Sequence, residues 1–235
     1  RSIIKLLPET ATTSGAIYLS NREGNEQLDV LSLSGEDLRR MRGSEAAMVF
    51  QEPNSVLNPV YTIGWQIEEG LRAHGMKDKK ELRAKSVDIL KKVGIPDAET
   101  RIDYYPHQFS GGQKQRIAIA GVVAMKPQCI IFDEPTAMLD PKGRKEIMAI
   151  IDELHAEGIT VVLITHFMEE TVNADRLIIM NEGRVLLDGA PAEVFKQRDL
   201  IRSVNLDVPL MAELSFKLRE LGVKVPDNII TEEKM

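Results

Sequence analysis

Two apolar runs rich in β-branched residues constrain the fold of the second half of this chain. The first, Cys129–Phe132, ends at a pair of acids, and the second, Ile159–Thr165, is apolar on both faces. Such runs are typical of buried strands in parallel sheets. Between them, apolar residues recur at helical spacing, with Asp140 and Pro141 suited to begin a helix and Gly158 to end it. Strand, helix, strand predicts a right-handed crossover and an α/β fold.

Further strands are predicted from short alternating or apolar segments. Residues 16–24 have the pattern of a hairpin, and Ala46–Phe50 that of a strand. Arg176–Met180 and Val185–Leu187 predict a second hairpin around a glycine turn.

Two stretches have a helical pattern instead. From about 62 to 93 the chain has mixed charges, with Leu82, Ile89, Leu90 and Val93 on one face, which predicts a small helical subdomain within the α/β core. Near the end, leucines at helical spacing predict one amphipathic helix; they are Leu210, Leu214, Leu218 and Leu221.

The composition is that of an ordinary globular chain, with 43% hydrophobic and 28% charged residues in a length of 235. The formal net charge of −6 disfavours broad binding to nucleic acid or anionic lipid, and we expect no nucleic-acid partner. Cys129 is the single cysteine, which excludes a disulfide within the chain and fits a reducing compartment. No apolar run approaches the roughly 20 residues of a membrane-spanning helix.

The most specific local pattern is a serine followed by two glycines where a helix is predicted to begin. The residues are Ser110, Gly111, Gly112 and Gln113. A helix start offers free backbone N–H groups and the positive end of the helix dipole, and glycine lets an anion come close. The pattern indicates a phosphate-binding helix start, with an ordinary serine cap as the alternative.

A pair of acids follows the first apolar run. Asp133 and Glu134 stand at the predicted carboxyl end of a parallel strand, where α/β sheets bind their ligands. Asp133 suits a magnesium ion, and Glu134 suits a base that orients an attacking water. The alternative is two acids in solvent at a strand end.

Two single residues also follow predicted strands. Gln51 comes after the strand at 46–50 and suits a ligand of magnesium or water, and His166 comes after the strand at 159–165 and suits a hydrogen bond to a terminal phosphate. Either residue alone is more often structural. The four segments in this order form a specific combination.

Together these segments resemble the motifs of the ATP-binding subunits of ABC transporters. Gln51 matches the Q-loop, Ser110–Gln113 the signature motif, and Cys129–Glu134 the Walker B strand. Ala137–Asp140 matches the D-loop and His166 the switch histidine. The resemblance covers nearly the whole chain, up to about residue 205.

The resemblance differs between the two halves. Residues 1 to about 115 resemble subunits of dipeptide, oligopeptide or nickel importers, through segments such as Tyr105–Gly112. From about Gln113 onward the chain resembles energy-coupling-factor ATPases, which drive vitamin and cobalt uptake, through Pro135–Pro141 and Thr165–Glu170. The halves therefore suggest different cargo, and both an intermediate subfamily and a fusion of two genes would give this pattern.

The family's phosphate loop, G-x-x-x-x-G-K-[ST], does not occur in the sequence. Gly70–Gly75 has the glycine interval, but Met76 stands at the lysine position. Residues 1–8 resemble the helix that follows the loop in peptide importers, so we expect the chain to begin just downstream of it. Losing three charge-assisted hydrogen bonds would cost on the order of 5 kcal/mol, or about 10³–10⁴ in affinity. We expect the isolated chain to hydrolyse ATP weakly or not at all.

The resemblance implies a P-loop NTPase-like parallel sheet core with an inserted helical subdomain, lacking its N-terminal strand and phosphate loop. We expect four parts. Residues 1–61 form the truncated first part of the core with the Q-loop, and 62–110 the helical subdomain. Residues 111–199 form the rest of the core, and 200–235 a C-terminal helical extension.

In such transporters two subunits pair head to tail, and ATP lies between the phosphate loop of one and the signature motif of the other. The resemblance implies that Ser110–Gln113 serve the partner's nucleotide and that Asp140 links the two sites.

For catalysis, the resemblance implies that Glu134 polarises the attacking water and that His166 contacts the γ-phosphate. Asp133 and Gln51 would hold Mg²⁺.

The resemblance also implies a separate membrane permease and a place in the cytoplasm, on the inner face of the membrane. The helical subdomain would pass its motion to the permease near the surface after Gln51. Two alternatives stay open: a non-catalytic partner that supplies its signature motif to another subunit, and a remnant α/β protein that binds no nucleotide.

Overall fold

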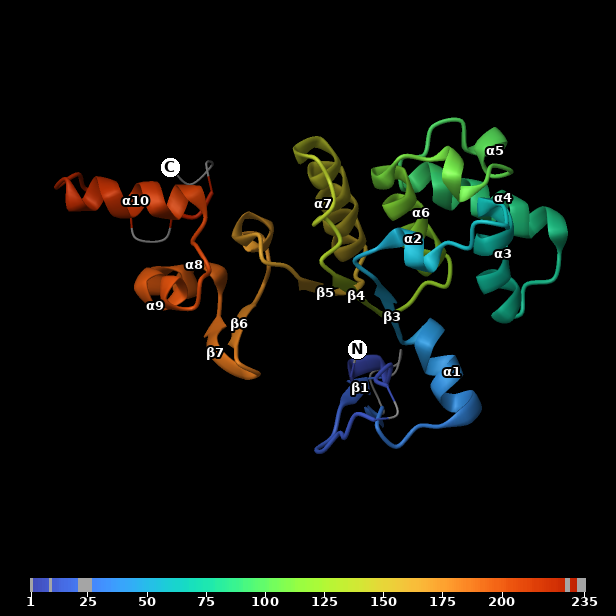
Figure 1. Cartoon of the computed structure of the whole chain (residues 1–235), viewed down its shortest axis with the longest axis horizontal. Coiled ribbons are helices and arrows are strands. Elements are labelled where there is room, and N and C mark those ends of the chain that lie inside the picture. Colours follow the sequence, from blue (N-terminus) through green and yellow to red (C-terminus); the bar gives the residue numbers. More distant parts are fainter. Residues whose placement is uncertain (1, 9, 21–26, 227–228, 232–235) are drawn as a thin grey trace. The chain divides into compact units, whose positions relative to one another are not determined.

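The computed structural model describes residues 2–8, 10–20, 27–226 and 229–231, and it divides into two compact units at 164/165 (Figure 1). Each unit contains its own cluster of buried apolar side chains, and each is described by itself. This boundary lies inside the segment 111–199 that the sequence pattern assigns to one domain.

A three-stranded parallel sheet forms the centre of the first unit. Its strands are β3 (Ala46–Val49), β4 (Cys129–Asp133) and β5 (Thr160–Ile164), in the order β3-β4-β5. Helix α7 (Pro141–Ala156) connects β4 to β5, as the sequence predicts. The carboxyl ends of all three strands therefore lie at one edge of the sheet.

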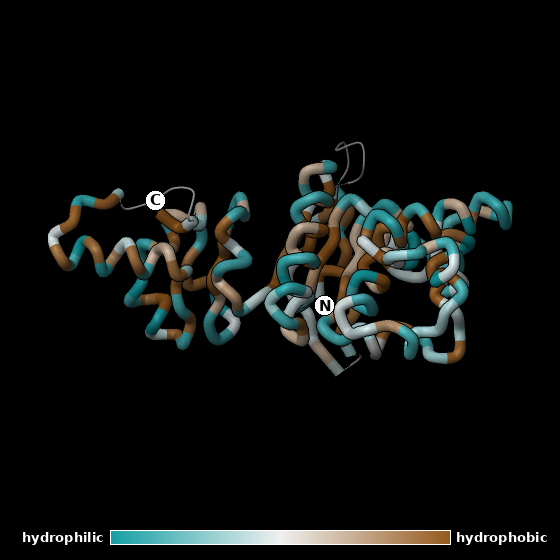
Figure 2. Tube along the Cα trace, turned by 90° about the horizontal axis from the view of Figure 1, so that it is seen from above, coloured by the Kyte–Doolittle hydropathy of each residue, from teal (hydrophilic) through white to brown (hydrophobic). Residues whose placement is uncertain are grey.

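Strand β4 separates two apolar layers. Ile130 and Phe132 are buried in the cluster formed with the helices, whereas Ile131 between them is buried in a cluster with Ile4 and Met41. The alternation follows from the period of two along a strand. Figure 1 shows α6 and α7 on one side of the strands and α1 on the other, and Figure 2 shows hydrophobic residues concentrated along the strands.

The N-terminal segment covers the second face of the sheet. Its elements are η1 (Ser2–Ile4), β1 (Tyr18–Ser20), β2 (Gln27–Asp29) and α1 (Gly35–Ser44). Lys5 donates to the carbonyl oxygens of Leu31 and Leu33, and Arg42 to that of Ile4 at 2.9 Å. β1 and β2 pair antiparallel, which confirms a hairpin, but residues 21–24 of the prediction lie outside the described residues.

Strand β5 differs from its prediction in burial. Its sequence is apolar on both faces, yet within the described sheet it pairs only with β4, and its side chains are half-buried or exposed. Ile164 is 43% exposed. The strand type and direction are as predicted, while the expected burial was wrong because the sheet has no described strand on the far side of β5.

Short helices and loops connect β3 to β4. They are α2 (Pro53–Val56), α3 (Ile63–Ala73), α4 (Lys79–Lys92), α5 (Ala98–Arg101), η2 (Pro106–Gln108) and α6 (Gly111–Val123). Thr62 caps α3 by accepting from the Trp65 N–H, and Asp78 caps α4 in the same way. The predicted face of α4 is buried, and Gly94 ends the helix region with φ +72°.

The second unit begins at Thr165 and continues with a hairpin and short helices. Its elements are η3 (Met168–Thr171), β6 (Leu177–Asn181), β7 (Arg184–Gly189), α8 (Pro191–Val194), η4 (Phe195–Gln197), α9 (Arg198–Ser203) and α10 (Leu210–Glu220). The predicted hairpin is confirmed. Among the helices that the structure describes, none combines the length and apolar character needed to span a bilayer.

Helix α10 is oriented differently from what its leucines suggest. Leu210 is 71% exposed and Leu221, just after the helix, is 79% exposed, whereas Ala212 and Ser215 are buried. The expected helix exists, but the residues that it buries are the small ones, and Ala212 belongs to the apolar cluster of the second unit.

Gly64 gives a test of how the helical segment is held together. Its N–H donates to the Ile102 carbonyl oxygen at 2.7 Å, and an added Cβ would lie 2.9 Å from that oxygen and 2.5 Å from Ile102 Cγ1. We expect Gly64→Ala to lower the free energy of unfolding by about 1–3 kcal/mol through overpacking. Urea unfolding followed by circular dichroism measures this.

Gly70 in the same helix is the matched control, because a Cβ there would meet no atom nearer than 3.7 Å. Gly70→Ala is expected to be neutral, or to raise the free energy of unfolding by up to about 1 kcal/mol through helix propensity. Equal destabilisation by both substitutions would contradict the close contact at Gly64.

Candidate functional site

The acidic pair lies at the carboxyl edge of the sheet, as predicted. Asp133 is the last residue of β4, and Glu134 follows it with φ +47°, a left-handed conformation that costs a non-glycine residue about 1–2 kcal/mol. The Glu134 N–H donates to the Ile164 carbonyl oxygen at 2.9 Å, which holds the turn against the end of β5. Both acids are half-buried. Strain held in place at a sheet edge points to a function for this turn.

Gln51 contacts Glu134 directly. Its Nε2 donates to Glu134 Oε2 at 2.9 Å, although the two residues are 83 positions apart in the chain. The contact arises because β3 is the immediate neighbour of β4, so that the residues following both strands meet. The structure thus brings together two of the residues that the sequence singled out.

The donor chemistry at this edge fits a magnesium ion. Gln51 uses its amide nitrogen toward Glu134, so its amide oxygen is not engaged in that bond, and Asp133 supplies a carboxylate. Magnesium prefers oxygen ligands and is often held by one or two carboxylates together with substrate phosphates. The described residues contain no group of three or more His, Cys, Asp or Glu side chains that could hold a metal ion.

The predicted helix start at Ser110 is the N-terminus of α6. Ser110 Oγ accepts from the Gln113 N–H at 3.3 Å, and the Gln113 side chain accepts from the Ser110 N–H at 3.1 Å. This capping box satisfies two of the four N–H groups that a helix start leaves without intrahelical acceptors. The N–H groups of Gly111 and Gly112 are the other two, and they remain available to an anion.

Neither the packing nor the backbone conformation of the chain requires a glycine at Gly111, the first residue of α6. An added Cβ on Gly111 would meet nothing within 4 Å, and its φ lies outside the left-handed region. On Gly112 the nearest atom would be Leu139 Cδ2 at 3.8 Å, an ordinary contact. Since glycine disfavours a helix by about 1 kcal/mol relative to alanine, its presence at Gly111 suits close approach by a molecule outside this chain.

Asp140 has a structural role at the start of α7. Its Oδ1 accepts from the Gly143 N–H at 2.7 Å, which confirms the predicted helix cap. The preceding residue, Leu139, lies next to Gly112, so the predicted D-loop and signature segments are neighbours within one chain.

His166 belongs to the second unit and lies on an exposed loop. Its ring packs on that of Phe167 with centroids 4.1 Å apart. Cys129 at the start of β4 takes no part in the site, because burial raises the pKa of its thiol and disfavours the reactive thiolate.

Sequence alone did not predict a groove beside the helices of the first unit, which we call the α2–α3–α6 groove. It has a volume of about 450 Å³ and is lined by Val56, Leu57, Asn58, Tyr61, Trp65, Gln66, Ile67, Glu69, Ile117, Ala118, Gly121 and Val122. Tyr61 and Trp65 stack with ring centroids 4.0 Å apart. The signal that could have revealed it is this exposed aromatic pair, four residues apart in the sequence on either side of the α3 cap.

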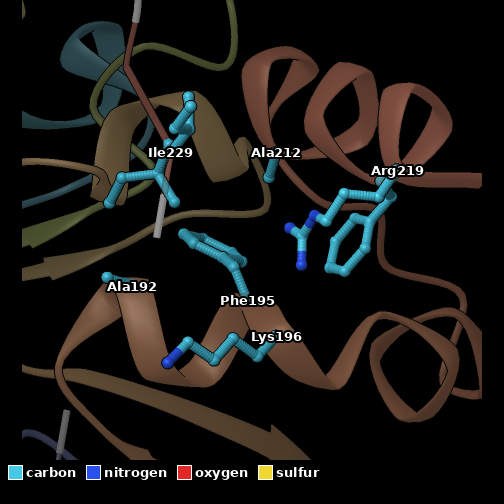
Figure 3. A pocket seen from close by; sticks show the side chains of 8 residues that line it. Ala192, Phe195, Lys196, Ala212, Arg219 and Ile229 are labelled. Carbon is cyan, nitrogen blue, oxygen red and sulfur yellow. The ribbon is translucent and has the colours of Figure 1, made fainter. Parts of the chain in front are cut away.

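A cavity in the second unit is too small for a nucleotide. Figure 3 shows it between Phe195, Ala212 and Arg219. Its volume is about 10 Å³, which leaves room for about one water molecule.

Comparison with known proteins agrees with this geometry. The family described as ABC transporter matches residues 2–137. The energy-coupling factor transporter ATP-binding protein EcfA1 of Caldanaerobacter subterraneus subsp. tengcongensis is 42% identical over 228 residues, covering 95% of this chain and 76% of that protein. EcfA1 of Clostridioides difficile is 45% identical over 91% of this chain and 76% of its own length.

Another relative belongs to a different transporter. The dipeptide transport ATP-binding protein DppD of Haemophilus influenzae is 39% identical over 86% of this chain and 62% of its own length. The likeness to energy-coupling proteins crosses the whole chain and is not confined to the residues after Gln113. The likeness to a dipeptide transport protein likewise extends beyond the first half.

Solved structures match as well. The dimeric post-hydrolysis state of the ATP-binding cassette MJ0796, bound to ADP and phosphate, has a TM-score of 0.66 at 30% identity, over 76% of this chain and 74% of the other. CbiO1 of Clostridium perfringens, part of the ABC transporter complex cbiONQ, has a TM-score of 0.63 at 36% identity, over 84% and 72%. The parallel α/β core, the assembled sheet edge and these matches together show that the chain belongs to the ABC transporter family, among its ATP-binding subunits.

Proposed function

We propose that this chain is the ATP-binding subunit of an importer of the energy-coupling-factor type, which drives transport through a separate membrane permease. The relatives named EcfA1 support this type. The observation that carries the proposal is the contact between Gln51 and Glu134, because it assembles a metal ligand and a base at the sheet edge where α/β proteins bind ligands. The subunit would work in the cytoplasm, on the inner face of the cell membrane.

The residues at the sheet edge would divide the chemistry between them. The Glu134 carboxylate accepts a hydrogen bond from the attacking water and orients it toward the γ-phosphorus. Asp133 and the amide oxygen of Gln51 would hold Mg²⁺, which would neutralise charge on the phosphate oxygens. His166, which belongs to the second unit, would donate a hydrogen bond to the γ-phosphate.

The open start of α6 would act on nucleotide held by a second ABC subunit. The Gly111 and Gly112 N–H groups face an anion without interference from side chains, and Ser110 adds a hydroxyl. Leu139 lies beside Gly112, and Asp140 is the next residue in the chain. Asp140 would therefore lie near the α6 start and would link the nucleotide sites of the two paired subunits.

The α2–α3–α6 groove would take a cytoplasmic helix of the permease. Its stacked aromatic pair and apolar residues suit the apolar face of an amphipathic helix. α2 follows Gln51 directly, which gives a short covalent path from the groove to Glu134.

A second candidate function is that of a non-catalytic partner, whose signature segment completes a site on another ABC subunit. It is favoured by one observation: the start of α6 leaves room at Gly111 for a molecule outside this chain.

Mixing experiments test these functions. We expect the purified chain to release little phosphate from Mg-ATP, and phosphate release to rise when a complete energy-coupling ATPase is added. Gly111→Ala should lower the stimulated rate at least about tenfold, because the added methyl group keeps the phosphate from hydrogen bonds worth about 1.5–3 kcal/mol. Ser110→Arg should abolish the stimulation.

Gly121→Ala in the same helix is the control, since a Cβ there also meets nothing within 4 Å. Glu134→Gln in this chain separates the two candidates: it lowers the stimulated rate if the chain's own site turns over, and leaves it unchanged for a non-catalytic partner. If mixing does not raise the rate of phosphate release, both candidate functions are contradicted. The remaining alternative is then a remnant α/β protein that binds no nucleotide.

Trp65 is the single tryptophan of the chain and lines the α2–α3–α6 groove, so its fluorescence reports docking. Adding detergent-purified permease should shift the Trp65 emission. The same mixture made with the Trp65→Phe variant gives the fluorescence of the permease alone, which is subtracted. Gly121→Leu should weaken binding by about tenfold or more, because the side chain occupies the groove, whereas Gly121→Ala should not. Unchanged emission, or equal binding by both variants, would contradict docking in this groove.

A further inference from the structure

One buried carboxylate in the second unit has no part in the proposed chemistry. Glu170 lies in η3 and is only 9% exposed. Burying an ionised carboxylate is costly unless hydrogen bonds or charges compensate for the lost water. Its neighbour Glu169 is exposed, so the sequence offers two adjacent acids in opposite environments.

Glu170 is bonded to the loop that carries His166. The Thr165 hydroxyl donates to Glu170 Oε2 at 2.7 Å, the usual length of an O–H···O hydrogen bond. The Glu170 N–H also donates to the Phe167 carbonyl oxygen at 3.1 Å. Glu170 is therefore attached to both ends of the segment 165–167.

The Thr165 hydroxyl also acts as an acceptor. It accepts from the Phe167 N–H at 3.0 Å, closing a turn of the kind that serine and threonine form two residues ahead. Donating to Glu170 fixes the direction of the hydroxyl proton, which leaves its lone pairs for Phe167. One hydroxyl thus joins the residues on both sides of His166 and limits the backbone freedom of His166.

The rest of the turn is anchored by packing. Met168 is buried in the apolar cluster of the second unit, and the Thr171 hydroxyl donates to the Met168 carbonyl oxygen at 2.8 Å. The His166 ring then lies against the Phe167 ring while its own surface stays exposed. The loop presents an exposed imidazole on a fixed base.

We propose that Glu170 is a positioning residue for His166, acting through the Thr165 hydroxyl. The inference rests on the proposed role of His166 toward phosphate. A buried apolar residue at 170 could fill the same volume, but it could not accept the Thr165 hydroxyl proton. The carboxylate holds the imidazole ready before any nucleotide arrives, which lowers the entropy lost when the histidine binds a phosphate.

Histidine ring resonances test this in the full chain, without nucleotide and at one fixed pH. The chain has four histidines, and His166→Gln identifies the signal of His166. Because the Phe167 ring lies 4.1 Å away, His166 protons should show a ring-current shift. We expect Glu170→Ala and Thr165→Val to reduce that shift by at least half, and Thr165→Ser, which keeps the hydroxyl, to preserve it.

Glu169→Ala is the matched control and should leave the shift unchanged. The signals of His74, His107 and His155, all in the first unit, show whether that unit is folded, and far-ultraviolet circular dichroism compares the fold of the whole chain. If Glu170→Ala does not fold, the comparison of Thr165→Val with Thr165→Ser still shows whether the Thr165 hydroxyl positions His166. A His166 shift that is the same in wild type and in Thr165→Val would overturn the inference.

The same spectra separate this inference from the proposed function. Since they are recorded without nucleotide, a preserved dependence on Thr165 and Glu170 supports the positioning role even if mixed subunits hydrolyse no ATP.

Discussion

The pairing of β4 with a parallel strand on each side is the interaction on which the site depends. β3 and β5 bond to β4 in the same direction, with Val49 beside Phe132 and Asp133 beside Ile164. This register brings the residues that follow β3 and β4 into contact, and it supplies the Ile164 carbonyl oxygen that holds Glu134 in its left-handed turn. Glu134 and Gln51 are therefore positioned by the backbone pairing of the sheet.

The two phosphate-directed features differ in what they require of the chain. Gln51 and Glu134 are in contact within one unit, and Asp133 directly precedes Glu134. The α6 start has its local hydrogen bonds satisfied by the capping box, yet two N–H groups and an open glycine surface face outward. Such a surface has a use only toward another molecule, which agrees with a family whose relative MJ0796 is seen as a dimer bound to ADP and phosphate.

The sequence was sufficient to predict the elements around β4, since their hydrophobic patterns have clear periods and clear capping residues such as Asp140 and Gly158. It was not sufficient for β5 and α10. A strand sequence that is apolar on both faces can be buried on both faces. Whether its side chains are buried depends on which strands and helices pack against it, and in the described sheet β5 pairs only with β4. In α10 the helical period was correct, yet the helix buries Ala212 and Ser215, while Leu210 and Leu214 are exposed. The Gln51–Glu134 contact needed the strand order, which local patterns do not contain.

The free side of β5 affects how this chain behaves in solution. Its backbone N–H and C=O groups on that side have no strand partner among the described residues, and the side chains flanking them are valine, leucine and isoleucine. An uncharged edge of this kind is a template onto which any extended segment can add. Aggregation of the 235-residue chain should therefore rise steeply with concentration, and low temperature and dilute storage would favour a monodisperse preparation.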